Sequence, residues 1–120
     1  HQEPLYTNYK FANNGIGIDP DSKDIGRQKI TKHKEDSLLF KIPSLRNIGF
    51  TYPYMHDGRF QSLKEVIDHY CDHIEISPTT DVFLHKKINL SKNERVELVS
   101  FLHTLNDTSF IFNKKHHYPN

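Results

Sequence analysis

The chain has 120 residues, enough for one domain, and a formal net charge of +1 from 16 Lys and Arg against 15 Asp and Glu. This balance gives no basis for nucleic-acid binding, and no apolar run approaches the roughly 18 residues that span a membrane. Hydrophobic residues make up 35% of the chain, which is low for a globular domain. We therefore expect a large apolar cofactor, a covering domain, or both to complete the core.

The first half of the chain is predicted to be mostly irregular. Residues 1–27 are rich in turn residues and are expected to form a loop, with a short extended piece at residues 9–12. A short helix is predicted around residues 28–35. Residues 40–60 contain two prolines and several aromatic side chains, which favour irregular backbone tied down by buried rings over a strand or a long helix.

Two helices are predicted in the second half, at residues 62–73 and 91–105. Each begins with a capping box, in which Ser62 pairs with Glu65 and Ser91 pairs with Glu94. Apolar residues then recur at helical spacing, so that each helix has one apolar face. These stripes are Leu63, Val66, Ile67 and Tyr70 in the first helix, and Val96, Val99, Leu102 and Leu105, with Leu98 and Phe101 alongside, in the second. Residues 74–90 are expected to form a loop, and residues 107–120 a polar, partly aromatic tail.

The most informative stretch is PSLRN at residues 43–47, followed by T-x-PYMHDG at residues 51–58. It resembles the signature of the bacterial di-haem cytochrome c peroxidase family, which includes the MauG-type enzymes. The segment at residues 90–107 also resembles the last helix of that family. The resemblance implies a mainly α, cytochrome c-like domain with two or three helices and much irregular backbone at residues 1–108, followed by a tail at residues 109–120.

The resemblance also implies a haem ligand at the start of the chain. In the family, a segment similar to residues 2–11 directly follows the histidine of the haem-attachment motif C-x-x-C-H. His1 would then be the proximal iron ligand of haem c. We expect the chain to begin just after the two attachment cysteines, because its single cysteine, Cys71, lies in a different context.

Met55 and Tyr70 compete as the sixth iron ligand. Composition points to Met55, the only methionine, because a thioether suits a high-potential electron-transfer haem. The resemblance points to Tyr70, because the peroxidase branch has its ligating methionine at this position and the MauG branch has a tyrosine. Tyr70 is thus the preferred ligand, and Met55 is expected to pack against the haem edge or the core.

Further site residues are implied in the segment at residues 46–57. The family resemblance implies that Thr51 and Pro53 offer backbone carbonyls to a calcium ion between two haem domains. Arg46 is expected to pair with a haem propionate or to form a structural salt bridge. His56 and Asp57 look like an orienting pair, in which the carboxylate accepts a hydrogen bond from the imidazole. The expected haem-pocket lining is Phe40, Leu45, Phe50, Tyr54, Met55, Phe60 and Tyr70.

Two other candidates are disfavoured. His69 and His73 have the i, i+4 spacing of a zinc-binding pair. The glutamate of an H-E-x-x-H motif is missing, however, and the two histidines are predicted to lie opposite the apolar face. Cys71 has no base at triad-like spacing and no redox partner, so it is not expected to be a catalytic thiol.

The resemblance implies that the chain is the electron-transfer haem domain of a periplasmic di-haem peroxidase or MauG-like oxidase. It would relay electrons to a peroxide-reactive haem in an N-terminal domain, and would have no peroxidase activity alone. The implied partners are that domain and either a small electron-donor protein or a protein substrate, and homodimer formation is left open. Two alternatives also stay open: a haem-free structural or interaction domain, and a single-haem electron carrier.

Overall fold

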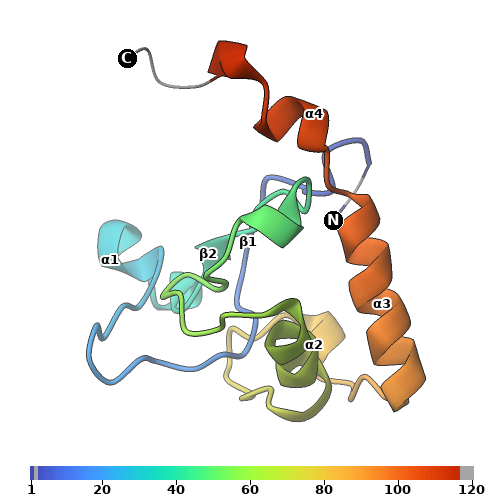
Figure 1. Cartoon of the computed structure of the whole chain (residues 1–120). Helices are drawn as coiled ribbons and strands as arrows, with labels where there is room; N and C mark the ends of the chain where they lie inside the picture. The colour runs from blue at the N-terminus through green and yellow to red at the C-terminus, as the bar shows by residue number, and fades with distance from the viewer. Residues whose placement is uncertain (2, 117–120) are drawn as a thin grey trace.

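The computed structural model describes residue 1 and residues 3–116, and it is mainly α-helical with much irregular backbone (Figure 1). The helices and strands are β1 (Phe11–Ala12), α1 (Gln28–Thr31), β2 (Phe40–Lys41), α2 (Leu63–Asp72), α3 (Lys92–Thr104) and α4 (Thr108–Ile111). Short 3-10 helices lie at Lys34–Asp36, Ile48–Phe50, Val82–Leu84 and Lys114–His116. Within the described residues, no helix is both long enough and apolar enough to cross a membrane.

Both predicted long helices and both capping boxes are confirmed. In α2, the Glu65 amide donates to Ser62 Oγ at 3.3 Å and the Ser62 amide donates to Glu65 Oε2 at 2.8 Å. Ser91 and Glu94 make the same reciprocal pair at the start of α3. These bonds satisfy amides that have no partner within the helix, which explains why each helix begins directly after its serine.

The core forms where α2 contacts α3. Its buried residues are Leu63, Ile67 and Cys71 from α2, Leu102 from α3, and Leu105, which directly follows α3. The segment at residues 45–54 and the N-terminal segment pack against this cluster through Leu45, Ile48, Tyr54 and Tyr6. No large side chain among the described residues is completely shielded from solvent, so the core is thin, as the composition predicted.

Only part of the predicted apolar stripe of α3 is buried. Leu102 is buried and Val99 is half-buried, but Val96 and Phe101 are 65% and 50% exposed. Helical spacing places these residues on one broad face, but burial requires a partner, and α2 covers only a part of that face.

The shorter elements differ from the predictions. The helix predicted around residues 28–35 is divided, because Lys32 takes a left-handed conformation that ends α1. The segment predicted to contain no strand begins with β2, which pairs with β1 in an antiparallel ladder. The polar tail contains α4, which begins where Asp107 accepts a hydrogen bond from the Phe110 amide. Residues 117–120 of the predicted tail lie outside the described residues, and the boundary at residue 108 stays a prediction.

Arg95 links the solvent-facing edges of α2 and α3. Its Nη1 lies 2.7 Å from Asp68 Oδ1 and 2.6 Å from Asp72 Oδ2. Hydrogen bonds from Lys64 and Arg95 lower the pKa of Asp68, and the hydrogen bond from Arg95 lowers the pKa of Asp72. Because the folded state depresses these carboxyl pKa values, the pairs stabilise it above the unfolded pKa and lose this effect as the pH falls.

We therefore predict that Arg95→Met makes the free energy of unfolding less dependent on acid pH. At neutral pH the variant should be less stable than the native protein, and the difference should shrink below the ordinary aspartate pKa of about 3.9. Urea unfolding across this pH range measures the effect. Adding Asp68→Asn and Asp72→Asn to Arg95→Met should cause little further loss, because the partner is already gone. Parallel pH profiles for native and variant protein would show that the pairs do not contribute.

Candidate functional site

The N-terminal histidine is held in a defined orientation. His1 Nδ1 lies 2.6 Å from the carbonyl oxygen of Tyr6. A carbonyl only accepts, so Nδ1 carries the proton and donates it, and the lone pair of the neutral ring is on Nε2. Metal-binding histidines are commonly oriented in this way by a backbone carbonyl. The donor chemistry of His1 therefore fits an iron ligand.

Arg46 fixes the segment that carries His1. Its Nε and Nη2 donate to the Pro4 carbonyl at 2.9 Å and 2.6 Å, and its guanidinium lies over the Tyr6 ring at 5.6 Å. Ser44 Oγ donates to the Leu5 carbonyl on the same side. The two predicted roles of Arg46 were a propionate contact and a salt bridge, and the structure shows a third, a clamp on the backbone.

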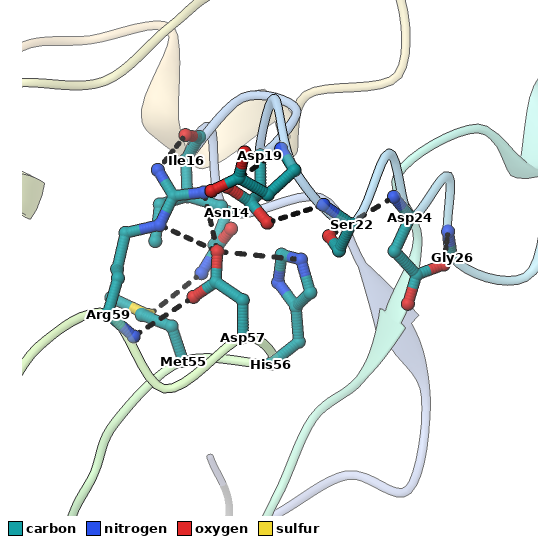
Figure 2. A network of polar contacts seen from close by, with 11 residues as sticks. Asn14, Ile16, Asp19, Ser22, Asp24, Gly26, Met55, His56, Asp57 and Arg59 are labelled. Carbon is teal, nitrogen blue, oxygen red and sulfur yellow. Dashed lines mark hydrogen bonds and ion pairs between the residues drawn. The ribbon is translucent and has the colours of Figure 1, made fainter.

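The two candidates for the sixth ligand both lie near one amide, that of Asn14. Asn14 Nδ2 donates to Met55 Sδ at 3.2 Å, and Figure 2 draws this contact as a dashed line. The same side chain lies within hydrogen-bonding reach of the Tyr70 phenol. Burial raises the pKa of the Tyr70 phenol, and the bond to Asn14 opposes this rise. Met55 and Tyr70 are thus neighbours, although the sequence separates them.

Tyr70 is half-buried on α2 and lines a hollow of about 220 Å³ together with Cys71 and His85. The Cys71 thiol itself is free and buried. A phenol in such a place needs a partner for its hydroxyl group. Asn14 is one such partner within the described residues, and a metal ion bound to the phenol oxygen would be a second.

The predicted position of His69 is wrong. Its side chain was expected opposite the apolar face, but the residue is only 3% exposed. His69 Nε2 donates to the Asn14 carbonyl at 3.0 Å, and its ring contacts Phe60 and Tyr70. Burial lowers its pKa, so the neutral ring is favoured. His73 is exposed, so the two histidines have different surroundings, and His69 connects α2 to the Asn14 loop.

The predicted His56–Asp57 hydrogen bond is not formed. His56 Nε2 and Asp57 Oδ2 are 4.0 Å apart, which is too far. Asp57 instead accepts from Arg59 Nε at 2.7 Å, and Arg59 Nη1 donates to the Ile16 carbonyl at 3.1 Å (Figure 2). Burial alone would raise the pKa of Asp57, but the bonds from Arg59 lower it. The pair of Asp57 and Arg59 locks the turn to the loop that contains Asn14.

His56 is left with a buried nitrogen. Its ring stacks on Phe40, with ring centroids 3.6 Å apart, and its Nε2 has no hydrogen-bond partner among the described residues. Buried polar atoms are normally satisfied. This nitrogen therefore has a capacity for hydrogen bonding that the described protein groups do not use.

The proposed calcium ligands lie on an exposed turn. Thr51 and Pro53 are both exposed, and Thr51 Oγ1 donates to the Ile48 carbonyl at 3.2 Å. No group of three His, Cys, Asp or Glu side chains that could hold a metal ion occurs in the described part of the chain. A calcium site here would therefore need its carboxylate or amide ligands from elsewhere, in keeping with an interface position.

The predicted haem-pocket residues divide into three groups. Leu45 and Tyr54 pack against the α2–α3 core. Phe50 is 41% exposed and packs edge-to-face on Phe112 beyond α4, so it does not join the others. The remaining members lie near the Asn14 amide or contact the rings of His56 and His69: Phe40, Met55, Phe60 and Tyr70.

Sequence reasoning missed Asn14. It lies in an Asn-Asn-Gly turn, and this pattern predicts a bend but no side-chain partner. Its contacts with Met55 and Tyr70 depend on how the loop folds over α2, for which the sequence gives no local signal.

Comparisons with known proteins identify relatives of this chain and agree with its fold. The chain is 42% identical over 107 residues to the methylamine utilization protein MauG of Methylorubrum extorquens, and 30% identical over 107 residues to cytochrome c551 peroxidase of Nitrosomonas europaea. In each case the match covers 88% of this chain and 29% of the relative. No protein-family model matches the sequence.

A solved structure shows the same fold. It is the crystal structure of a MauG-like protein associated with microbial copper homeostasis, with a TM-score of 0.76 and 35% sequence identity, over 99% of this chain and 40% of that one. The predicted mainly α, cytochrome c-like fold is confirmed. The chain belongs to the family of MauG and the cytochrome c peroxidases, and spans less than a third of the length of these two curated relatives.

Proposed function

We propose that this chain is the C-terminal, electron-transfer haem domain of a di-haem peroxidase or MauG-like oxidase. In this proposal it relays electrons to a peroxide-reactive haem in an N-terminal domain of the same protein. The observation that carries the proposal is the orientation of His1, whose Nδ1 donates to the Tyr6 carbonyl and so leaves Nε2 as the metal-binding atom. Kinship with cytochrome c peroxidases supports it.

Other features of the structure also fit a haem. The core is thin, and several aromatic side chains are exposed: Tyr9, Phe11, Phe50, Tyr52, Phe83, Phe101, Phe110 and Phe112. A porphyrin would bury apolar surface that the described residues leave uncovered. The unpartnered Nε2 of His56 is suited to a polar group at the edge of such a cofactor.

Haem c, when bound, supplies one-electron transfer. The residues of this chain supply its surroundings. His1 would bind iron through Nε2, with the Tyr6 carbonyl fixing the ring and Arg46 fixing the segment. Arg46 donates hydrogen bonds from Nε and Nη2 to the Pro4 carbonyl. The remaining N–H groups of its guanidinium suit a haem propionate. Tyr70 would be the sixth ligand, on a half-buried position of α2 that limits access of water.

The choice of Tyr70 over Met55 leans toward a MauG-like role. A phenolate is a hard anionic donor that stabilises Fe(III) and higher oxidation states, while a thioether favours Fe(II). Met55 already has a partner, because its sulfur accepts a hydrogen bond from Asn14. The external partner would be a small electron-donor protein or a protein substrate, and homodimer formation stays open. We also propose that the parent protein is periplasmic. Cell fractionation tests this, and recovery of the protein in the cytoplasmic fraction would contradict it.

The first test is the intact mass of the denatured natural protein that contains this chain. These 120 residues account for 14.1 kDa. Covalent haem should add its mass to that of the polypeptide and should remain on a proteolytic fragment that carries His1 together with the attachment cysteines predicted before it. A mass equal to the bare polypeptide would favour the haem-free structural domain. One covalent haem in the whole protein would favour a single-haem electron carrier, and two would support the di-haem protein.

Replacing the sixth ligand should change the reduction potential. We predict that Tyr70→Met in the haem-loaded protein raises the potential of this haem by on the order of 100 mV, within the ~0.8 V range that axial ligands can set. Redox titration followed by absorbance gives the value. Tyr54→Phe is a matched control, because the Tyr54 hydroxyl donates to the Ile48 carbonyl in the core. An unchanged potential and ferric spectrum in Tyr70→Met would remove Tyr70 as a ligand.

Calcium between this domain and the rest of the protein is a separate proposal. Backbone carbonyls of Thr51 and Pro53 suit calcium, which tolerates irregular oxygen geometry. We predict that a calcium chelator lowers the thermal midpoint of the full-length protein, since a bound ion stabilises only the folded state. Added calcium, but not magnesium, should restore it. Activity and stability that do not respond to the chelator would argue against the site.

A further inference from the structure

The Asn14 side chain contacts both residues that compete for the sixth ligand position. Its Nδ2 lies 3.2 Å from Met55 Sδ, and Figure 2 marks this contact with a dashed line. It also lies within hydrogen-bonding reach of the Tyr70 phenol on α2. One amide therefore restrains the thioether and the phenol together.

The loop around Asn14 is itself fixed on α2 and on the segment after it. The Asn14 carbonyl accepts from the buried His69 at 3.0 Å, and the Gly15 carbonyl accepts from the Glu75 amide at 2.8 Å. Gly15 has a φ of +67°, and a Cβ there would lie 2.7 Å from Ile74 Cγ2. The close approach requires glycine. The position of the Asn14 amide is therefore set by the fold before any ligand binds.

The contact with Asn14 restrains the Met55 side chain, which would otherwise rotate freely about its own bonds. A methionine side chain has three rotatable bonds and adapts readily to its surroundings. Met55 Sδ is held by the Asn14 amide, while its backbone sits in a turn with a φ of +71°. Without the amide, the thioether would be free to change rotamer next to Tyr70.

The amide also discriminates between the two donors. An N–H group binds an anionic oxygen more strongly than a neutral acceptor, and sulfur is a weak acceptor. The oxygen of a metal-bound Tyr70 phenolate still has lone pairs that can accept a hydrogen bond from Asn14. The same amide can at the same time donate to the Met55 sulfur.

We propose that Asn14 is a positioning residue, which would favour Tyr70 over Met55 as the sixth iron ligand by holding the Met55 thioether in place. This inference rests on the proposed function, because it presumes that Tyr70 is the sixth ligand. Nothing in the family signature identifies Asn14, because it lies outside residues 43–58. The role follows from the contacts with Met55, Tyr70 and His69.

The test uses the haem-loaded full-length protein with Asn14→Leu, which keeps the size of the side chain and removes its N–H groups. We expect a near-infrared band from charge transfer between thioether and Fe(III) in the variant, and no such band in the native protein. The band should disappear in the double variant Asn14→Leu/Met55→Leu. Asn14→Asp, which also lacks the donor, should give the same band if the leucine variant folds poorly. Asn93→Leu, at an exposed position of α3, is the control and should leave the spectrum unchanged.

Two results would overturn the inference: a native ferric spectrum in both folded Asn14 variants, or a new band that persists when Met55 is also replaced. Tyr70→Phe, measured in parallel, separates this inference from the proposed function. A changed spectrum in Tyr70→Phe with native spectra in the Asn14 variants rejects the role of Asn14 alone. A native spectrum in Tyr70→Phe rejects Tyr70 as ligand and the role of Asn14 with it.

Discussion

The contact between α2 and α3 is the interaction on which the rest of the described structure depends. Leu63 and Ile67 meet Leu102 and Leu105 there, and the N-terminal segment and the signature segment pack on the same cluster. At the outer edge, Arg95 joins the two helices through ion pairs. The apolar cluster is small, so it cannot by itself hold the long irregular segments in place. These segments rely on hydrogen bonds, and several of the bonds converge on residues that were predicted to serve the cofactor.

Those polar contacts give the site its shape. Arg46 clamps the segment of His1, Arg59 ties the turn to the Ile16 carbonyl, and His69 ties α2 to Asn14. Each contact joins a charged or ring donor to a backbone carbonyl. Such carbonyls cannot be left unpaired inside a protein without cost, so the contacts satisfy the loops and orient the side chains together. A site built on irregular backbone can be rigid for this reason.

The thin core and the fact that the chain matches only part of its relatives' length have a common explanation. The chain matches less than a third of MauG, and residues on α3 and around α4 leave apolar surface exposed, including Val96, Phe101 and Phe112. A cofactor and a neighbouring domain are the two kinds of surface that would cover such residues. In the proposed function both are present. His1 and Tyr70 would hold the haem, and the second domain would supply the ligands that a calcium site at Thr51 and Pro53 lacks.

The sequence by itself determined the two long helices, because the capping boxes at Ser62 and Ser91 and the apolar spacing are local signals that act within one turn. It also determined the family, through many fixed positions in one short segment. Only the tertiary structure decided which residues are buried and which side chains meet. His69 is buried and Val96 is exposed because burial depends on the element packed against each face. Asn14 touches Met55 and Tyr70 because a loop distant in sequence folds over α2, and no local pattern encodes that contact.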